Sequence, residues 1–187
     1  MMITCYNRKS ALADYRLTVL GGAMEYRLGT LMDLDDICLL VSEAITEMEK
    51  HGIYQWDELY PTRTDFEEDI RKNNLYVVLH EGAFIAFYVI SRECDEQYGN
   101  GQWKYEGDSA YILHRFCVSP KMQNKGVGKA VLAHIENQIK DLGYQSVRLD
   151  TFTQNPFAQR LYRHSGYEPR GYADWRKGRF DLMEKKL

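Results

Sequence analysis

Apolar residues recur along much of this chain with a period near 3.6, which predicts four helices. The first is expected from Asp33, its predicted N-cap, to about Lys50, where His51-Gly52 ends it. Its apolar positions are Leu34, Ile37, Leu40, Val41, Ala44, Ile45 and Met48. The remaining three are predicted after Thr64 with Phe66 and Ile70 facing inward, over residues 126–142, and over residues 156–164.

Between these helices lie β-favouring apolar runs that predict strands. They cover residues 25–29, 75–80, 83–91, 109–118, 145–152, 167–172 and 179–185. Glu81-Gly82 is a two-residue hairpin turn between two of them. The order βααβββαβαββ predicts an α/β fold, in which a mixed, α+β-like sheet carries helices on both faces.

Two segments fall outside this pattern. Residues 1–23 are expected to be an N-terminal extension preceding a domain of residues 24–187. Residues 92–108 form a long polar, glycine-bearing and aromatic connection, which is unusual inside a compact domain and often functional. We therefore expect it to act as a lid.

Composition narrows the class of protein. The 187 residues are 44% hydrophobic and 27% charged, with a net charge of −3, so no basic field favours nucleic acid. No apolar run is long enough to span a membrane and no signal-peptide pattern opens the chain, which predicts a cytoplasmic protein without a membrane partner. The four cysteines form no CxxC pair and have no histidine at zinc-ligand spacing, so reduced thiols and no metal site are expected.

The most informative segment is Gln123-Asn-Lys-Gly-Val-Gly128, between a predicted strand and a predicted helix. Glycines there leave amide groups exposed at a helix N-terminus, which attracts phosphate. A Walker A loop is disfavoured, since Gln123 replaces its first glycine and Ala130 its hydroxyl. A dinucleotide fingerprint lacks its third glycine at Val131, although Asp150 is placed like its ribose-binding acid. A glycine-rich helix start without a ligand stays open.

The same segment fits Gln/Arg-x-x-Gly-x-Gly/Ala, and here the chain resembles the GNAT superfamily of N-acetyltransferases. Flanking motifs agree: Phe116-Cys-Val-Ser-Pro120 before the loop, Lys129-Ala-Val-Leu132 after it, and Asn155-Pro-Phe-Ala-Gln-Arg-Leu-Tyr-Arg-His-Ser-Gly-Tyr167 further on. The resemblance implies a mostly antiparallel central sheet, splayed at one parallel strand pair, and acetyl-CoA as the acetyl donor.

The resemblance also implies which residues bind that donor. They are Phe116, Cys117, Val118, Gln123, Asn124, Lys125, Gly126, Val127, Gly128, Lys129, Asn155 and Ala158. The N–H of Val118 would face the thioester carbonyl, and Tyr162 would be the general acid. Simpler roles stay open: a solvated lysine for Lys125, a helix cap for Asn155, and ring packing for Tyr162.

An amine acceptor also needs a base and a binding surface. Tyr111, Glu43, His114 and Asp150 are near the expected site, and His114 and Asp150 are the preferred bases. Aromatic residues beside Asp57 and Glu58 suit an ammonium ligand, although ring packing would also explain them. The predicted substrate contacts are Tyr54, Trp56 and Tyr60, with Trp103 from the 92–108 segment.

The sequence thus predicts an acetyl-CoA-dependent N-acetyltransferase that acts on a primary amine, small-molecule or peptide, by direct attack. A non-catalytic acyl-CoA-binding regulatory or scaffold module is the alternative, and a nucleotide-binding switch protein fits the motifs less well. A monomer and a homodimer are both compatible with the chain.

Overall fold

The computed structural model describes residues 18–19, 22–105 and 109–187. Its strands form one sheet in the order β1-β2-β3-β4-β5-β6-β8-β7. Their bounds are β1 Thr18–Val19, β2 Gly22–Leu28, β3 Leu75–His80, β4 Ala83–Ser91, β5 Ala110–Val118, β6 Ser146–Phe152, β7 Glu168–Trp175 and β8 Gly178–Lys186. The helices are α1 Leu34–Lys50, α2 Arg63–Arg71, α3 Val127–Asp141 and α4 Pro156–His164. The predicted order of these elements is confirmed.

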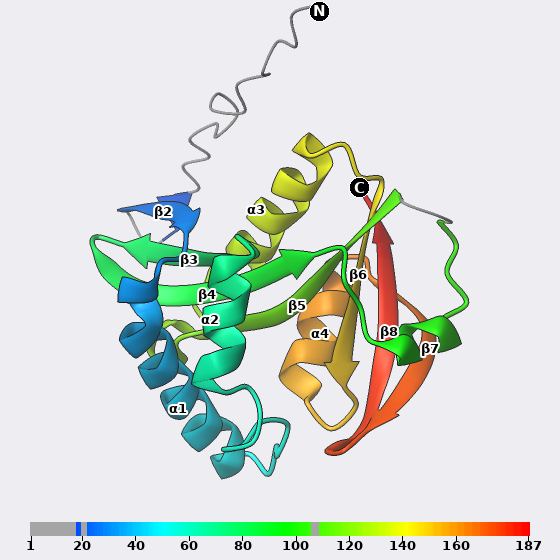
Figure 1. The fold of residues 1–187 in the computed structure, drawn as a ribbon, viewed down its shortest axis with the longest axis horizontal. Helices are drawn as coiled ribbons and strands as arrows, with labels where there is room; N and C mark the ends of the chain where they lie inside the picture. The colour runs from blue at the N-terminus through cyan, green and yellow to red at the C-terminus, as the bar shows by residue number, and fades with distance from the viewer. Residues whose placement is uncertain (1–17, 20–21, 106–108) are drawn as a thin grey trace, which may run out of the picture.

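The sheet is splayed between β5 and β6, its parallel pair. Their register runs from Ala110 opposite Ser146 to Leu113 opposite Leu149 and then stops. β5 nevertheless continues to Val118, still paired with β4, and β6 continues to Phe152, still paired with β8. Figure 1 shows the two strands starting side by side and diverging toward their carboxyl ends. The expected splay at one parallel pair is confirmed.

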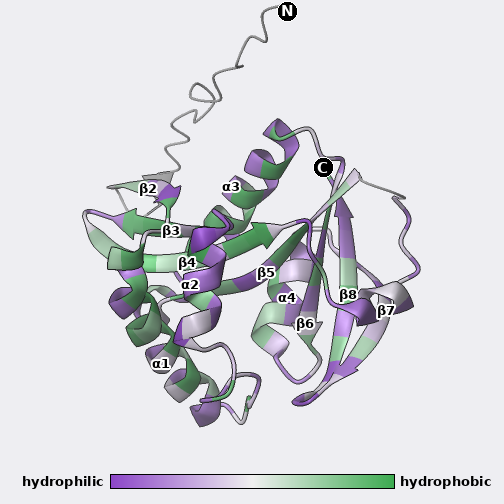
Figure 2. Ribbon diagram, in the orientation of Figure 1, coloured by the Kyte–Doolittle hydropathy of each residue, from purple (hydrophilic) through white to green (hydrophobic). Residues whose placement is uncertain are grey.

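Helices cover both faces of the sheet, and the alternation of side chains along β4 shows how (Figure 1). Ala86, Tyr88 and Ile90 pack in the cluster that contains α3. Phe87 and Val89, one residue out of step, pack with α1 and α2 on the opposite face. Because both faces are buried, β4 is almost continuously apolar, as Figure 2 shows for the central strands.

Helix starts differ from expectation in two places. Asp33 is the N-cap residue of α1 as predicted, but its side chain makes no capping bond there. It ends a short 3₁₀ helix, η1 (Leu31–Asp33), and accepts from Arg27 and from Thr30 N–H at 2.7 Å. α2 begins at Arg63 because Thr62 and Asp65 form a reciprocal capping box. The hairpin at Glu81-Gly82 is confirmed, with φ values of 51° and 78°.

The lid expected over residues 92–108 is instead a packed part of the domain. It contains the 3₁₀ helix η2 (Glu96–Asn100), whose Tyr98 is buried against Ile112 and Leu182. Gln102 N–H donates to Arg170 O of β7 at 2.7 Å, so this segment lies along the outer edge of β7. Residues 106–108 lie outside the described residues.

The expected N-terminal extension is described only in part, since residues 1–17 and 20–21 lie outside the described residues. Thr18 and Val19 pair with Ala23 and Gly22 of β2 as a two-residue strand. In the part of the chain described, no helix is both long and apolar enough to cross a membrane.

Candidate active site

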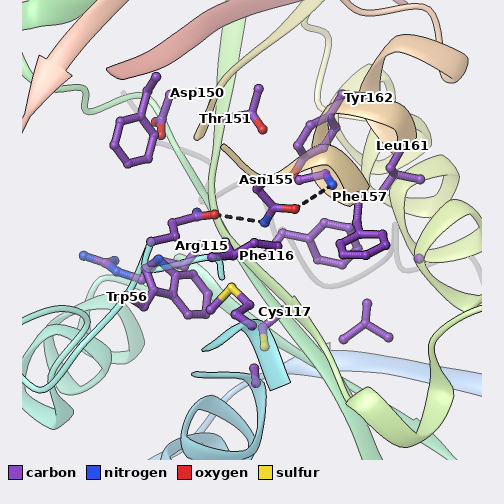
Figure 3. Close-up of a pocket in the computed structure, with 18 of the residues that line it drawn as sticks. Trp56, Arg115, Phe116, Cys117, Asp150, Thr151, Asn155, Phe157, Leu161 and Tyr162 are labelled. Atoms are coloured by element: carbon purple, nitrogen blue, oxygen red, sulfur yellow. Dashed lines mark hydrogen bonds between the residues drawn. The ribbon is translucent and has the colours of Figure 1, made fainter. Parts of the chain in front are cut away.

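A cavity of about 940 Å³ opens where β5 and β6 separate. Its walls come from the carboxyl ends of β5 and β6, the loop before α3, helices α1 and α4, the segment of Asp95 and Tyr98, and two loops further out. One of these outer loops joins α1 to α2, and the other is the turn between β7 and β8. Figure 3 shows Asp150, Thr151 and Tyr162 along one side of the cavity, with Trp56 and Arg115 across from them.

The glycine loop forms one end of this cavity. Asn124 and Gly126 have φ values of 59° and 79°, and the second is costly for any residue with a Cβ atom. Ala130 N–H is the first of α3 to bond within the helix, to Gly126 O at 3.0 Å. The amides of residues 127–129 therefore have no acceptor within the helix and are available to an anion at the positive end of the helix dipole.

The backbone of β5 forms the floor. Ser119 N–H donates to Ile85 O of β4 at 2.8 Å. Because neighbouring residues in a strand turn their N–H and C=O groups to opposite sides, those of Phe116 and Val118 face β6. Pairing with β6 ends at Leu113, so among the described residues these groups border the cavity without a strand partner. They could pair with an extended ligand.

Asn155 joins α4 to the outer part of the site. Its Oδ1 accepts from Ala158 N–H at 3.0 Å, capping the helix, and Pro156 occupies the first helical position. Its Nδ2 donates to Oε1 of Gln55 in the α1–α2 loop at 3.1 Å (Figure 3). The predicted cap role is confirmed, and the side chain also ties two walls of the cavity together.

Tyr162 reaches the cavity from α4. Its ring is 7% exposed and packs edge-on against Tyr167. Burial, followed by the charge of Asp150, raises the pKa of Tyr162 well above its usual value. The hydroxyl therefore stays protonated across the physiological range, as a proton donor requires.

Asp150 is the first residue of β6 beyond its pairing with β5. Burial raises the pKa of Asp150 to about 6, partly offset by a hydrogen bond from Tyr98 Oη at 2.8 Å. Within the described residues it has no lysine or arginine ion pair. A carboxylate with this pKa is ionised at pH 7 and is still a useful proton acceptor.

His114, the other predicted base, also borders the cavity but has a different environment. Its Nε2 lies 2.9 Å from Ser91 Oγ. Burial and the nearby Arg115 lower the pKa of His114 to about 4. It is neutral at pH 7 and a much weaker base than Asp150. Of the other candidates, Tyr111 packs on Tyr144 and Glu43 pairs with Lys121, and neither lines the cavity.

The structure separates the predicted donor contacts into two groups. Those that line the cavity are Phe116, Cys117, Val118, Gln123, Asn124, Gly126, Gly128, Lys129, Asn155 and Ala158. Lys125 is exposed outside it, and the side chain of Val127 lies in the core. Cys117 also packs with α1 and α2, and burial raises the pKa of its thiol, so it is a core residue.

The predicted aromatic contacts divide in the same way. Trp56 and Tyr60 line the cavity, and the Tyr60 ring lies 5.1 Å from the guanidinium of Arg115, which pairs with Asp69. Tyr54 is 57% exposed and does not line it. Trp103 lies outside as well, because it packs over the guanidinium of Arg148 and against Tyr98.

Sequence reasoning missed the outermost wall. It is formed by the β7–β8 hairpin, with Arg176 and Lys177 from the turn, Trp175 from the end of β7 and Phe180 from β8. Asp57 of the α1–α2 loop accepts from Arg176 at 2.7 and 2.8 Å and from Lys177 at 3.0 Å, so the two loops are joined. The basic pair in a hairpin turn was visible in the sequence, but nothing there indicated its partner.

Comparisons with known proteins identify the family and the fold of this chain. Residues 39–167 match the model of the acetyltransferase (GNAT) family. The chain is 25% identical to the uncharacterized N-acetyltransferase YesJ of Bacillus subtilis (strain 168), over 83% of this chain and 86% of that one.

Solved structures with similar folds include two bacterial acetyltransferases. A GNAT-family acetyltransferase of Streptococcus agalactiae 2603 gives a TM-score of 0.75 with 26% identity, covering 91% of this chain and 98% of that one. An acetyltransferase of Staphylococcus aureus Mu50 gives 0.68 with 28% identity, covering 86% and 97%. The fold of PaiA N-acetyltransferase from Thermoplasma acidophilum, solved in complex with coenzyme A, is similar at a TM-score of 0.67 and 18% identity, covering 88% and 99%.

Proposed function

Because this chain belongs to the acetyltransferase (GNAT) family and is an N-acetyltransferase, we propose that it moves the acetyl group of acetyl-CoA to a primary amine by direct attack. One observation carries the proposal. The unpaired backbone of Phe116 and Val118 lies between an anion-binding helix start and a pair of proton-transfer groups, Asp150 and Tyr162.

The donor end of the cavity fits acetyl-CoA. The amides of residues 127–129 suit the pyrophosphate, and Lys129 adds a positive charge at the same end. The free N–H and C=O groups of Phe116 and Val118 suit the amides of the pantetheine arm, which would add to β5 as a short strand. The solved coenzyme A complex of PaiA, which has the same fold, supports this donor.

Asp150 receives the proton of the acceptor amine, directly or through one water. A lysine-like amine has a pKa of about 10.4, so at pH 7 it is mostly an ammonium ion, which first releases one proton to solvent to give the neutral nucleophile. The nitrogen gives up a second proton when it attacks, and this is the one that Asp150 takes. A carboxylate with a pKa of about 6 keeps its charge at that pH and accepts the proton as the carbon–nitrogen bond forms.

The N–H of Val118 would hold the carbonyl oxygen while the amine nitrogen attacks the carbonyl carbon and the oxygen becomes negative. As the carbon–sulfur bond breaks, Tyr162 donates its proton to the departing sulfur, whose thiol has an ordinary pKa of about 8.5. The proton taken up by Asp150 then returns to Tyr162, directly or through solvent. The products are an N-acetyl amide and free CoA.

The acceptor end is framed by Trp56, Tyr60 and Trp175, and by the joined α1–α2 and β7–β8 loops. Aromatic faces beside a carboxylate suit an ammonium group on an apolar or aromatic body. The acceptor is therefore a small molecule or a flexible peptide end that enters beneath these loops.

The test is free-thiol release from acetyl-CoA across a panel of aliphatic, aromatic and peptide amines, with product mass measured. A stoichiometric N-acetyl product supports the proposal. Thermal stabilisation by acetyl-CoA with no product from any amine would instead favour the non-catalytic acyl-CoA-binding module. Stabilisation by ATP or NAD but not by acetyl-CoA would contradict both.

A further inference from the structure

We propose that Tyr98 is a positioning residue for the reaction, whose hydroxyl orients the Asp150 carboxylate and keeps it ionised. Tyr98 belongs to a segment that packs against the outer edge of the sheet. This inference rests on the proposed role of Asp150. The two residues are 52 positions apart in sequence, yet Tyr98 Oη donates to Asp150 Oδ1 at 2.8 Å.

The ring of Tyr98 is held firmly. It is 4% exposed and packs with Ile112, Ala173 and Leu182. Trp103 stacks on it with ring centroids 5.8 Å apart, and Trp103 Nε1 donates to the Tyr98 carbonyl at 2.9 Å. A hydroxyl on so constrained a ring points in one direction, so it fixes the carboxylate that it contacts.

The segment carrying Tyr98 is itself docked on β7. Gln97 Oε1 accepts from Asp174 N–H at 3.1 Å. Gly171 allows a close approach, because a Cβ atom there would lie 2.8 Å from the Asn100 carbonyl oxygen. These contacts hold η2 where the Tyr98 side chain passes inward to the cavity wall, which Asp150 shares.

Within the described residues, Tyr98 is the one side chain that hydrogen-bonds to Asp150. The bond is made to Oδ1, one of the two carboxylate oxygens. Other charged or titratable groups face Asp150 from every side, and four of them interact with it electrostatically: Asp95 before η2, Arg115 of β5, Tyr60 of the α1–α2 loop, and Tyr162 of α4. Of these four groups, Arg115 favours the ionised form, and it is already paired with Asp69. A backbone hydrogen bond to the Asp150 carboxylate also favours ionisation, after the bond from Tyr98.

Removing the Tyr98 hydroxyl should therefore leave a carboxylate that is harder to ionise and free to rotate. Loss of one hydrogen bond to a charged group corresponds to a pKa rise of about one unit. The rise would appear in the acid limb of the rate profile, where a purely structural role would have no effect.

The experiment measures kcat/KM against pH from 5 to 9 at saturating acetyl-CoA, with the best amine from the panel. It compares the wild type with Tyr98→Phe, Asp150→Asn and Tyr88→Phe. Tyr88 is the matched control, since it is also a buried tyrosine whose hydroxyl donates to a side chain: Tyr88 Oη lies 2.7 Å from Gln138 Oε1. This pair lies outside the cavity lining. We expect the apparent pKa of the acid limb to rise by about one unit in Tyr98→Phe and to stay unchanged in Tyr88→Phe. In Asp150→Asn the acid limb should vanish.

The same pKa is read without turnover by carbon NMR of protein labelled at the aspartate carboxyl, with Asp150→Asn identifying the signal. If the Asp150 carboxyl signal titrates with the same pKa in Tyr98→Phe as in the wild type, the proposal is overturned. It is also overturned if the acid limb keeps its pKa in Tyr98→Phe but is lost in Asp150→Asn, and in that case the proposed function stands. A wild-type acid limb in Asp150→Asn would instead remove Asp150 as the base.

Discussion

The side-chain amide of Asn155 bonds in two directions, so that its oxygen caps α4 at Ala158 N–H while its nitrogen donates to Gln55 Oε1 at 3.1 Å. This single residue links the helix that carries Tyr162 to the loop that frames the proposed acceptor end. The proposed donor and acceptor halves of the cavity therefore share a mechanical connection.

Substitutions at Asn155 should separate its two roles. Asn155→Ala loses the cap and should lower the free energy of unfolding by about 1 kcal/mol, whereas Asn155→Ser keeps a capping oxygen and most of that stability. Urea unfolding measures both. Gln55→Ala keeps the cap intact, so it should match the wild type in urea while raising KM for the amine. Equal stability of the Ala and Ser variants would contradict the capping role.

Tyr162→Phe tests the proton donor. General acid catalysis is worth about 10²–10⁴ in rate, so we expect kcat to fall by at least about 100-fold. Affinity for acetyl-CoA, measured by calorimetry on the free protein, should be unchanged. Tyr88→Phe, at a buried tyrosine outside the cavity, is the control. Wild-type turnover in Tyr162→Phe would show that another group, such as water, protonates the thiolate.

Asp150 should also make stability depend on pH. Its pKa is raised in the folded protein to about 6, above the ordinary 3.8, so folding favours the protonated form. The associated stability is fully present below about pH 4 and is lost as pH rises through 6. Asp150→Asn does not ionise and should exceed the wild type by on the order of 2–3 kcal/mol at pH 8.

The comparison is made by urea unfolding of both proteins at pH 4 and at pH 8. The free energy of unfolding of Asp150→Asn minus that of the wild type should increase as pH rises. A difference that does not change with pH would show that Asp150 has an ordinary pKa in the folded protein, and would weaken its assignment as a base with a pKa near 6.

Asp57→Ala should loosen the outer wall, because it removes the carboxylate that accepts from Arg176 and Lys177. We expect a several-fold rise in KM for the amine and little change in KM for acetyl-CoA, measured by thiol release. High salt should produce a similar rise in the wild type. Asp174→Ala removes a neighbouring exposed pair, Asp174 with Arg179, and should change neither constant.

Sequence periodicity was enough to predict the order of the elements. The helical recurrence of apolar residues differs clearly from the apolar runs of the strands in this chain, and turn residues such as Glu81-Gly82 mark where one element ends and the next begins. The glycine loop and the Asn155–Tyr162 stretch are local motifs that carry the resemblance to the acetyltransferase (GNAT) family, and that resemblance implied the splayed strand pair beside them. Asp33 lies at the N-cap of α1 as predicted, but its carboxylate bonds Arg27 of β2 rather than the start of α1, a long-range partner that the local pattern does not show.

The outer site could not be predicted in this way. Tyr98 with Asp150, Gln55 with Asn155, and Asp57 with Arg176 are side-chain pairs separated by 52, 100 and 119 residues, and such pairs have no sequence period. Trp103 looked like a ligand contact because it lies in a polar, glycine-rich segment. Its ring packs on Arg148 instead, an arrangement that needs the position of β6 to be known.

The separation of β5 from β6 has a consequence for how this protein can diverge. The main-chain N–H and C=O groups of Phe116 and Val118 have the same chemistry whatever side chains these positions carry. The proposed donor end therefore depends on strand geometry rather than on residue identity. Substitutions can accumulate there as long as the strands still part at Leu113. The acceptor end depends on particular side chains from separate loops, so new amine preferences can evolve there while the donor machinery stays unchanged.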